Sequence, residues 1–210
     1  MAELLTIYQK LLTCFGEQGW WPAQTPFEVV VGAVLTQNTA WRNVERAIEN
    51  LKRDEVLTPE GLIEIEESRL SQLIRPAGYY NVKARRLKNV MDFLQREYGG
   101  DLKRMCTEPL SRLREKILKV KGVGFETADS ILLYAVGKPI FVIDAYTKRI
   151  ISRHKMISDG ASYHEIQDFF MRNLPRDVEL YKEFHALMVK LAKTFCKTKL
   201  LCKGCPLEEE

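Results

Sequence analysis

Apolar residues recur at spacings of three and four along almost the whole chain, and this pattern restricts most of it to one kind of secondary structure. Leu4, Tyr8 and Leu11 would share one face of a helix, because an α-helix turns once every 3.6 residues. Similar stripes cover residues 44–51, 62–70, 87–94, 110–118 and 184–191. The one run typical of a strand, 139–143, has no clear partner, so we interpret it as an extended connector into a helix. The sequence therefore predicts an all-α protein of about ten helices.

Length and composition are ordinary for a globular protein. The chain has 210 residues, of which 46% are hydrophobic and 29% charged, and this is enough to form a sizeable apolar core. No apolar run approaches the roughly 18 to 20 residues that span a bilayer, and the first twelve residues lack the pattern of a signal peptide. We therefore expect a cytoplasmic protein with no membrane partner.

The charge pattern allows nucleic acid as a partner without requiring it. The net charge of +4 at pH 7 most often means a solvated surface. Its distribution is more informative, because several cations of one stretch would share a helix and could meet phosphates. They are Lys83, Arg85, Arg86 and Lys88.

Residues 118–129 join two amphipathic helices through a Gly122-Val123-Gly124 turn. Glycine accepts a positive φ, so the turn can be tight and can leave backbone N–H groups exposed. The second helix begins at once, which puts the positive end of its dipole beside the turn. Together these features would bind a phosphate, with Val123 packed inward to hold the helices together. The alternative is a plain corner between two helices with glycine as a cap.

An acidic residue, Asp144, follows the apolar run 139–143 and precedes a predicted helix. On its own it is most simply an N-cap, assisted by Thr147 at the third position. It stands eighteen residues after Glu126, in the second helix of the hairpin. A hairpin followed at this distance by such an acid resembles the catalytic segment of the endonuclease III superfamily of helix-hairpin-helix DNA glycosylases.

Two further segments are similar to this family. Residues 34–39 look like its early loop, whose glutamine, here Gln37, fills the gap left by an extruded base. Residues 76–84 match its Gly-x-Tyr-Asn-x-Lys-Ala segment, which inserts a wedge opposite the flipped nucleotide. Tyr79 would be that wedge. The resemblance thus extends over nearly the whole chain.

The resemblance implies an all-α, two-lobed helix-hairpin-helix glycosylase fold with a C-terminal cysteine loop. A six-helix lobe with the hairpin would span residues 22–135, and a second lobe would combine residues 1–21 with 136–210. The partner would be double-stranded DNA with damaged bases, bound by a monomer that is nucleoid-associated in a prokaryote. Asp144 would be catalytic. The implied DNA contacts are Gln37, Asn38, Tyr79, Lys83, Lys121, Gly122, Val123, Gly124 and Thr127.

One departure from the family pattern concerns Glu126. In bifunctional members a lysine two residues after the second hairpin glycine attacks the sugar C1′ and allows strand cleavage through a Schiff base. Here that position holds Glu126, which cannot form a Schiff base but suits the first turn of a helix. The expected reaction is therefore hydrolysis of the N-glycosidic bond alone. Asp144 would stabilise the oxocarbenium-like sugar and orient or deprotonate the attacking water.

The start of the chain narrows the expected substrate. Trp20-Trp21-Pro22, taken with Glu126 and the loop 34–39, looks like the 3-methyladenine glycosylase III subgroup, in which a Trp-Pro element lines the base pocket. An indole face attracts a cationic methylated purine, although tryptophans more often simply pack. We therefore expect an alkylated purine such as 3-methyladenine. Oxidised pyrimidines or mismatched bases are the alternative substrates, and a non-catalytic helix-hairpin-helix DNA-binding protein is the alternative class.

Three cysteines, Cys196, Cys202 and Cys205, lie within ten residues of the tail. Such crowding favours a metal or cluster site over disulfides in an intracellular chain, and the segment resembles the family's iron–sulfur loop. A [4Fe–4S] cluster normally takes four thiolates. A fourth cysteine is due just after Glu210, so either the sequence is truncated there or the ligand is lost. A cluster with another fourth ligand, a zinc ion and no metal are the alternatives.

Overall fold

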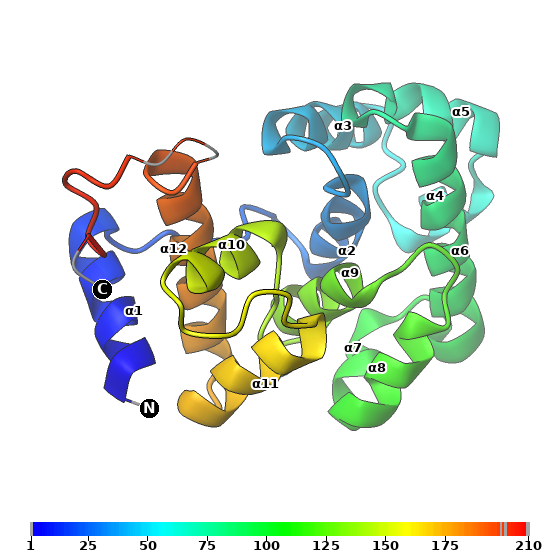
Figure 1. The fold of residues 1–210 in the computed structure, drawn as a ribbon. Helices are drawn as coiled ribbons and strands as arrows, with labels where there is room; N and C mark the ends of the chain where they lie inside the picture. Colours follow the sequence, from blue (N-terminus) through cyan, green and yellow to red (C-terminus); the bar gives the residue numbers. More distant parts are fainter. Residues whose placement is uncertain (1, 198, 200, 209–210) are drawn as a thin grey trace. The chain divides into compact units, whose positions relative to one another are not determined.

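A computed structural model describes residues 2–197, 199 and 201–208, which are helical over most of their length (Figure 1). These residues form twelve α-helices, a 3₁₀-helix (η1), a π-helical segment (η2) and no strand, so the all-α prediction is confirmed. None of the helices that they form has the length and apolar composition of a membrane span. The elements are α1 (Ala2–Phe15), α2 (Pro26–Leu35), α3 (Trp41–Arg53), α4 (Pro59–Glu64), α5 (Glu67–Leu73), η1 (Arg75–Ala77), α6 (Tyr80–Tyr98), α7 (Leu102–Thr107), α8 (Leu110–Leu118), α9 (Phe125–Ser130), η2 (Ile131–Ala135), α10 (Ala145–Arg153), α11 (Tyr163–Asn173) and α12 (Val178–Thr194).

The chain divides into two compact units. The central unit comprises Ala23–Lys138 and contains α2 to α9 with η1 and η2. The terminal unit comprises Met1–Pro22 and Pro139–Glu210 and contains α1, α10, α11 and α12.

Helix α2 is the core of the central unit. Every residue from Phe27 to Leu35 is buried, which requires that other elements surround the helix on all sides. Helices α3, α6 and α9 and the segment η2 pack against it. Thr25 begins the helix by accepting a hydrogen bond from the Glu28 N–H (3.1 Å), and Pro26 occupies the first turn.

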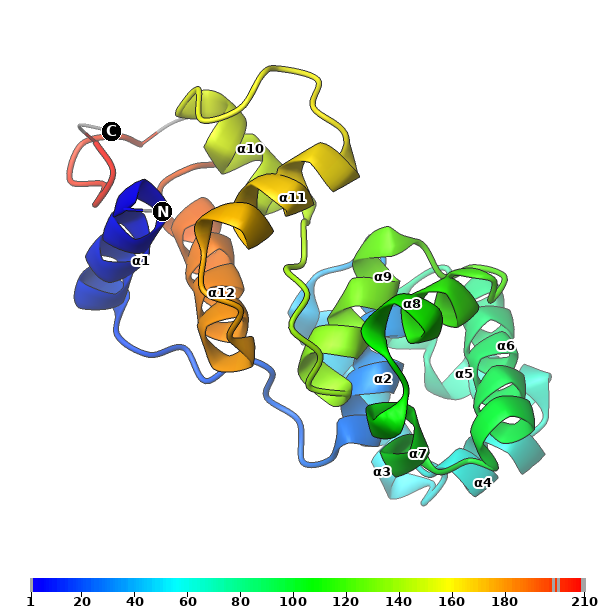
Figure 2. The ribbon, with the colours of Figure 1, turned by 90° about the horizontal axis from the view of Figure 1, so that it is seen from below.

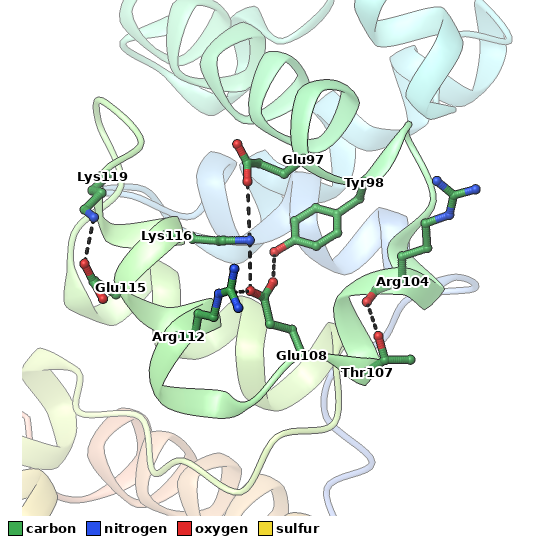
Figure 3. A network of polar contacts seen from close by, with 9 residues as sticks. All are labelled: Glu97, Tyr98, Arg104, Thr107, Glu108, Arg112, Glu115, Lys116 and Lys119. Carbon is green, nitrogen blue, oxygen red and sulfur yellow. Dashed lines mark hydrogen bonds and ion pairs between the residues drawn. The ribbon is translucent and has the colours of Figure 1, made fainter.

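A polar network joins α6 to α8 (Figure 3). The Glu108 carboxylate accepts a hydrogen bond from the Tyr98 hydroxyl and pairs with Lys116 Nζ (2.8 Å). Lys116 also pairs with Glu97 (3.3 Å). Burial, together with the adjacent Glu108 carboxylate, raises the pKa of Tyr98, so its hydroxyl remains a donor. The network therefore fixes the C-terminal end of α6 against α8.

Helices α8 and α9 are the two arms of the predicted hairpin, and α9 continues directly into η2. Asp129 on α9 is fully buried, at 0% exposure. The Arg114 guanidinium on α8 donates to both of its oxygens, from Nε to Oδ1 (2.7 Å) and from Nη2 to Oδ2 (3.0 Å). A bidentate pair of this kind adds geometric specificity to its charge. The Arg114–Asp129 pair therefore links α8 to α9 through their side chains.

Helix α12 is the core of the terminal unit, with α1 and α10 packed against it (Figure 2). Tyr8 on α1 meets Phe184 on α12 edge to face, with 5.5 Å between the ring centroids. After α1 the chain is fixed on α12 again, because the Gln18 N–H donates to Glu183 Oε1 (2.6 Å). This bond holds the segment that leads to the paired tryptophans.

The run 139–143 is extended, and its last four residues are buried, so the predicted connector is confirmed. Two side chains of α11 bind its backbone in place of a partner strand. Gln167 Nε2 donates to the Phe141 carbonyl (2.7 Å), and the Tyr163 hydroxyl accepts from the Ile143 N–H (3.4 Å). The backbone just ahead of Asp144 is therefore fixed.

The buried ion pair of the hairpin predicts a large loss of stability when its acid is removed. Asp129→Ala leaves the Arg114 guanidinium, 18% exposed, without its carboxylate, and we expect the free energy of unfolding to fall by about 3–5 kcal/mol. Urea unfolding followed by circular dichroism measures this change. Glu115→Ala, which breaks an exposed pair with Lys119, is the matched control and should not move the urea midpoint. Equal effects of the two substitutions would contradict a stabilising role of the Arg114–Asp129 pair.

Candidate functional site

The hairpin turn uses its two glycines for different reasons. Gly122 has a φ of +94°, and a Cβ there would lie 2.4 Å from Arg86 Cγ, so the backbone and the packing both require glycine. Gly124 is the N-cap of α9 with a φ of −97°, and a Cβ there would meet nothing within 4 Å. Val123 is buried, as the sequence predicts. The turn therefore leaves open space at Gly124, where α9 begins.

Gln37 is hydrogen-bonded to the hairpin. Its Nε2 donates to the Gly122 carbonyl (3.1 Å) and to Thr127 Oγ1 (2.9 Å). Its Oε1 accepts a hydrogen bond from Arg86 on α6. The structure therefore brings together three of the predicted DNA contacts, and Arg86, to which the sequence pattern assigned only a general positive charge.

Lys83 lies inside the central unit, with 1% of its surface exposed. Its ammonium donates to the Leu35 carbonyl at the end of α2 and to the Ala77 carbonyl at the end of η1, both at 2.8 Å. Burial, with a smaller contribution from the Arg86 charge, lowers the pKa of Lys83 to about 8. The expected phosphate contact of Lys83 is thus wrong for this structure, because its ammonium faces the interior.

Tyr79 projects from the start of α6. Its side chain is 71% exposed, although its backbone is in the left-handed region at φ +45° and ψ 33°. Gly78 before it also has a positive φ of +70°. A tyrosine is rarely held in this conformation, which costs of order 1–2 kcal/mol. Together with Val82, 46% exposed, it forms an apolar projection at the surface of the central unit.

The other predicted residues of the central unit are exposed. Asn38 follows Gln37 with a positive φ of +52°. Lys121 is exposed, and its carbonyl accepts a hydrogen bond from Asn89 Nδ2 (2.9 Å) on α6. Glu126 is exposed in the first turn of α9, where a carboxylate suits the helix dipole.

Asp144 is the N-cap of α10 in the terminal unit. Its Oδ1 accepts a hydrogen bond from the Thr147 N–H (2.6 Å), and its side chain is 12% exposed. Two other aspartates, Asp101 and Asp177, also cap helices through their side chains, but both are exposed. Asp144 therefore differs from them in being largely removed from water.

A histidine that the sequence reasoning left without a role faces this carboxylate. His185 Nε2 on α12 lies 3.7 Å from Asp144 Oδ2. Burial lowers the pKa of His185, and the Asp144 charge opposes that shift only in part. The available signal was its position, because His185 is a polar residue on the apolar face of α12 that Tyr181 and Met188 help to define.

The three residues of the predicted base pocket lie at the end of the N-terminal segment. Trp20 and Trp21 are half-buried and contact each other, with 5.2 Å between centroids and 47° between ring planes. Pro22 is exposed. The two indoles therefore form one aromatic pair within the terminal unit.

The tail cysteines do not form a ligand set in the described part of the chain. Cys196 is buried, and its Sγ accepts a hydrogen bond from Arg153 Nη1 (3.2 Å). Cys202 is exposed and Cys205 half-buried, and neither is in a disulfide. Among the described residues, no group of three or more histidines, cysteines and acids is arranged to hold a metal ion. The described residues thus present no set of four thiolates for a [4Fe–4S] cluster.

Comparison with known proteins gives a consistent family. Residues 31–176 match the family described as HhH-GPD superfamily base excision DNA repair protein. A protein of Methanocaldococcus jannaschii, named as a candidate DNA repair glycosylase, is 52% identical over 204 residues, which cover 97% of this chain and 93% of that protein. Endonuclease III of Thermotoga maritima is 30% identical over 184 residues, covering 87% of this chain and 81% of the relative.

Solved structures give the same fold. The 3-methyladenine DNA glycosylase of Helicobacter pylori, bound to 1,N6-ethenoadenine, has a TM-score of 0.79 and 30% identity, covering 91% of this chain and 96% of that one. An endonuclease III–DNA complex has a TM-score of 0.83 at 24% identity, covering 98% of this chain and 92% of that one. The two-lobed helix-hairpin-helix glycosylase fold predicted from the sequence is confirmed.

The buried ammonium of Lys83 predicts a particular dependence of stability on pH. Because the folded protein lowers its pKa from 10.5 to about 8, the unfolded chain binds more protons between these values. Stability from this group therefore rises with pH across that window. We expect the unfolding free energy of the wild type, relative to that of Lys83→Met, to rise from pH 8 to 10.5. From pH 6 to 7.5 the difference between the two proteins should stay constant. Urea titrations at each pH measure it, and a flat difference throughout would contradict the pKa shift.

Proposed function

Since the chain belongs to the HhH-GPD superfamily of base excision DNA repair proteins, we propose that it is a monofunctional DNA glycosylase that removes alkylated purines, such as 3-methyladenine, from double-stranded DNA. The observation that carries this proposal is the setting of Asp144. Its carboxylate is 12% exposed, is oriented by the Thr147 N–H and faces His185. A carboxylate held in this way is preorganised to act on a positive charge that develops beside it.

The proposed reaction is hydrolysis at the sugar C1′. The C1′–N bond breaks with its electron pair leaving on the base, and the sugar becomes oxocarbenium-like. The ionised Asp144 carboxylate stabilises this cation and accepts a proton from the attacking water, whose oxygen forms the new bond to C1′. The products are a free base and an abasic sugar. A cationic alkylated base leaves as a neutral molecule, which lowers the demand on the protein.

The absence of a lyase step is proposed from Glu126. This exposed residue stands two positions after Gly124, where bifunctional members of the family carry a lysine. Its carboxylate has no nucleophilic amine, so it cannot form the Schiff base from which strand cleavage would proceed. The product is then an intact strand with an abasic site.

An alkylated purine is favoured by two observations. The H. pylori protein that shares 30% identity over nearly its whole length is a 3-methyladenine glycosylase bound to a modified adenine. The Trp20–Trp21 pair supplies two indole faces, and such faces attract a cationic purine by stacking and by cation–π interaction. The proposed base pocket therefore includes Trp20, Trp21 and Pro22.

Damaged duplex DNA is the proposed partner, bound by the hairpin and opened by residues of two loops. The space at Gly124 would admit a phosphate to the start of α9, with Lys121 beside it. Because the reacting bond is inaccessible in the stack, the base must be extruded. Tyr79 is the proposed wedge, and Gln37 with Asn38 would occupy the vacated position. The Lys83 ammonium binds the Leu35 carbonyl, two residues before Gln37, and the Ala77 carbonyl, two residues before Tyr79.

A second candidate keeps the fold and Asp144 but takes another substrate. The name of one relative, thymine-DNA glycosylase from Aeropyrum pernix (29% identity), favours this candidate, in which the substrate is a mismatched base or a damaged pyrimidine. Base release distinguishes the candidates directly. Free 3-methyladenine from methylated duplex, without strand breaks in alkali-free gels, supports the proposal. Release from mismatched or oxidised duplex only would support the second candidate, and release from none would leave a DNA-binding protein.

Replacement of the proposed catalytic acid separates chemistry from capping. Asparagine caps a helix about as well as aspartate, so Asp144→Asn should keep α10 while lowering the rate of base release at least about 100-fold. Affinity for duplex DNA should change little. Asp177→Asn makes the same exchange at the exposed cap of α12 and should leave base release unchanged. Equal losses of binding and base release in Asp144→Asn would mean that the residue is only a structural cap.

The hairpin can be tested at the glycine whose surroundings are open. Gly124→Ser retains a good N-cap residue, so the free energy of unfolding should stay within about 0.5 kcal/mol. Its side chain fills the space that a phosphate would enter, and we expect the affinity for undamaged duplex to fall several-fold at every sequence tested. Fluorescence anisotropy at two salt concentrations measures the affinity. Unchanged binding would remove the turn from the interface.

A further inference from the structure

His185 is set against the proposed catalytic acid in a way that capping does not explain. Capping of α10 occupies Asp144 Oδ1, which accepts the Thr147 N–H (2.6 Å). The second oxygen, Oδ2, faces His185 Nε2 at 3.7 Å. Both residues belong to the terminal unit, where α10 and α12 pack against each other. The two carboxylate oxygens are thus served by two different helices.

Aromatic residues precede His185 on α12 and belong to one packed cluster. Phe141 stacks on Phe170, with 4.2 Å between centroids, and meets Tyr181 and Phe184 edge to face at 5.5 and 5.9 Å. Tyr181 lies one turn before His185 on α12, and Phe184 is its neighbour in the chain. The His185 and Asp144 side chains are only 8% and 12% exposed, and an electrostatic contact gains strength where water is excluded.

The charge state of His185 decides what it can do for the carboxylate. Burial keeps the pKa of His185 below its usual value, so the ring is neutral at pH 7. A neutral imidazole carries one N–H, which can point at Oδ2 without cancelling the negative charge. A charged imidazolium would instead neutralise the group that must stabilise a sugar cation. The distance of 3.7 Å exceeds that of an N–H···O hydrogen bond, so the contact here is electrostatic.

We propose that His185 is a positioning residue for Asp144, acting as a neutral imidazole whose Nε2–H holds Oδ2 and so keeps the carboxylate aimed at the sugar. The inference rests on the proposed function, because it gives His185 its role through Asp144. His185 does not itself touch the reacting atoms. The loss of His185 should therefore lower the rate of base release and leave the affinity for DNA unchanged.

Two substitutions distinguish the Nε2 donor from mere filling of the core. In His185→Gln the amide nitrogen is three bonds from Cβ, as Nε2 is, whereas in His185→Asn it is two bonds away, as Nδ1 is. We expect His185→Asn to lose about 10- to 100-fold in the single-turnover rate of base release, the range for an N–H donor that closes from 3.7 Å onto a charged group in the reacting complex. His185→Gln should recover most of that loss. His164→Asn, at an exposed histidine of α11, is the control.

The readout is the single-turnover rate on methylated duplex, with affinity measured on duplex that carries a tetrahydrofuran abasic analogue. The inference requires a rate loss in His185→Asn at unchanged affinity, with recovery by His185→Gln. Equal rates in the two variants, or losses that follow affinity, overturn it while the proposed function stands. A wild type that releases no base from any lesion overturns the proposed function and this inference with it.

A measurement on the wild type covers the case in which the buried substitutions prevent folding. Long-range proton–nitrogen NMR spectra identify which ring nitrogen of a histidine carries the proton. The chain has three histidines, so His154→Gln and His164→Gln assign the remaining signal. At pH 7 we expect a neutral His185 protonated on Nε2. A charged ring, or a proton on Nδ1 alone, overturns the inference.

Discussion

The central unit depends on one buried cation. The Lys83 ammonium donates to the last carbonyl of α2 and to the last carbonyl of η1, two groups that their helices leave without an intrahelical partner. The C-terminal ends of helices carry partial negative charge, so a cation suits both places. One side chain of α6 therefore sets where two loops begin. The first loop carries Gln37 and the second carries Tyr79, so the proposed wedge and the proposed gap filler share a single support.

Gln37 is satisfied within the central unit, and this has a consequence for the proposed reaction. Its amide donates to Gly122 and Thr127 and accepts from Arg86. A glutamine that enters a gap in DNA must exchange these bonds for bonds to a base, so the gain on insertion is the difference between two sets of contacts. Arg86 also packs on Gly122, where a Cβ would not fit. A phosphate at the hairpin and a base at Gln37 would thus act on neighbouring members of one network.

The sequence predicts what depends on local spacing and misses what depends on distant partners. Apolar stripes gave the helices, and an acid before a helix gave the Asp144 cap, because both patterns lie within a few neighbouring residues. Lys83 was expected at a phosphate, since a lysine in a basic stretch is usually exposed. Its acceptor Leu35 is 48 residues away, and no local pattern reports that contact. His185 was missed for the same reason, because its partner Asp144 lies on another helix.

Capping and catalysis are compatible roles for Asp144 because a carboxylate has two oxygens. The cap uses Oδ1, and the helix gains an acceptor for one of its first N–H groups. The same bond fixes the plane of the carboxylate, which leaves Oδ2 aimed in one direction. Asp101 and Asp177 cap in the same way but are exposed, so water competes for their second oxygen. At Asp144 that oxygen faces His185 instead, so the N-cap geometry supplies the orientation and burial supplies the field strength.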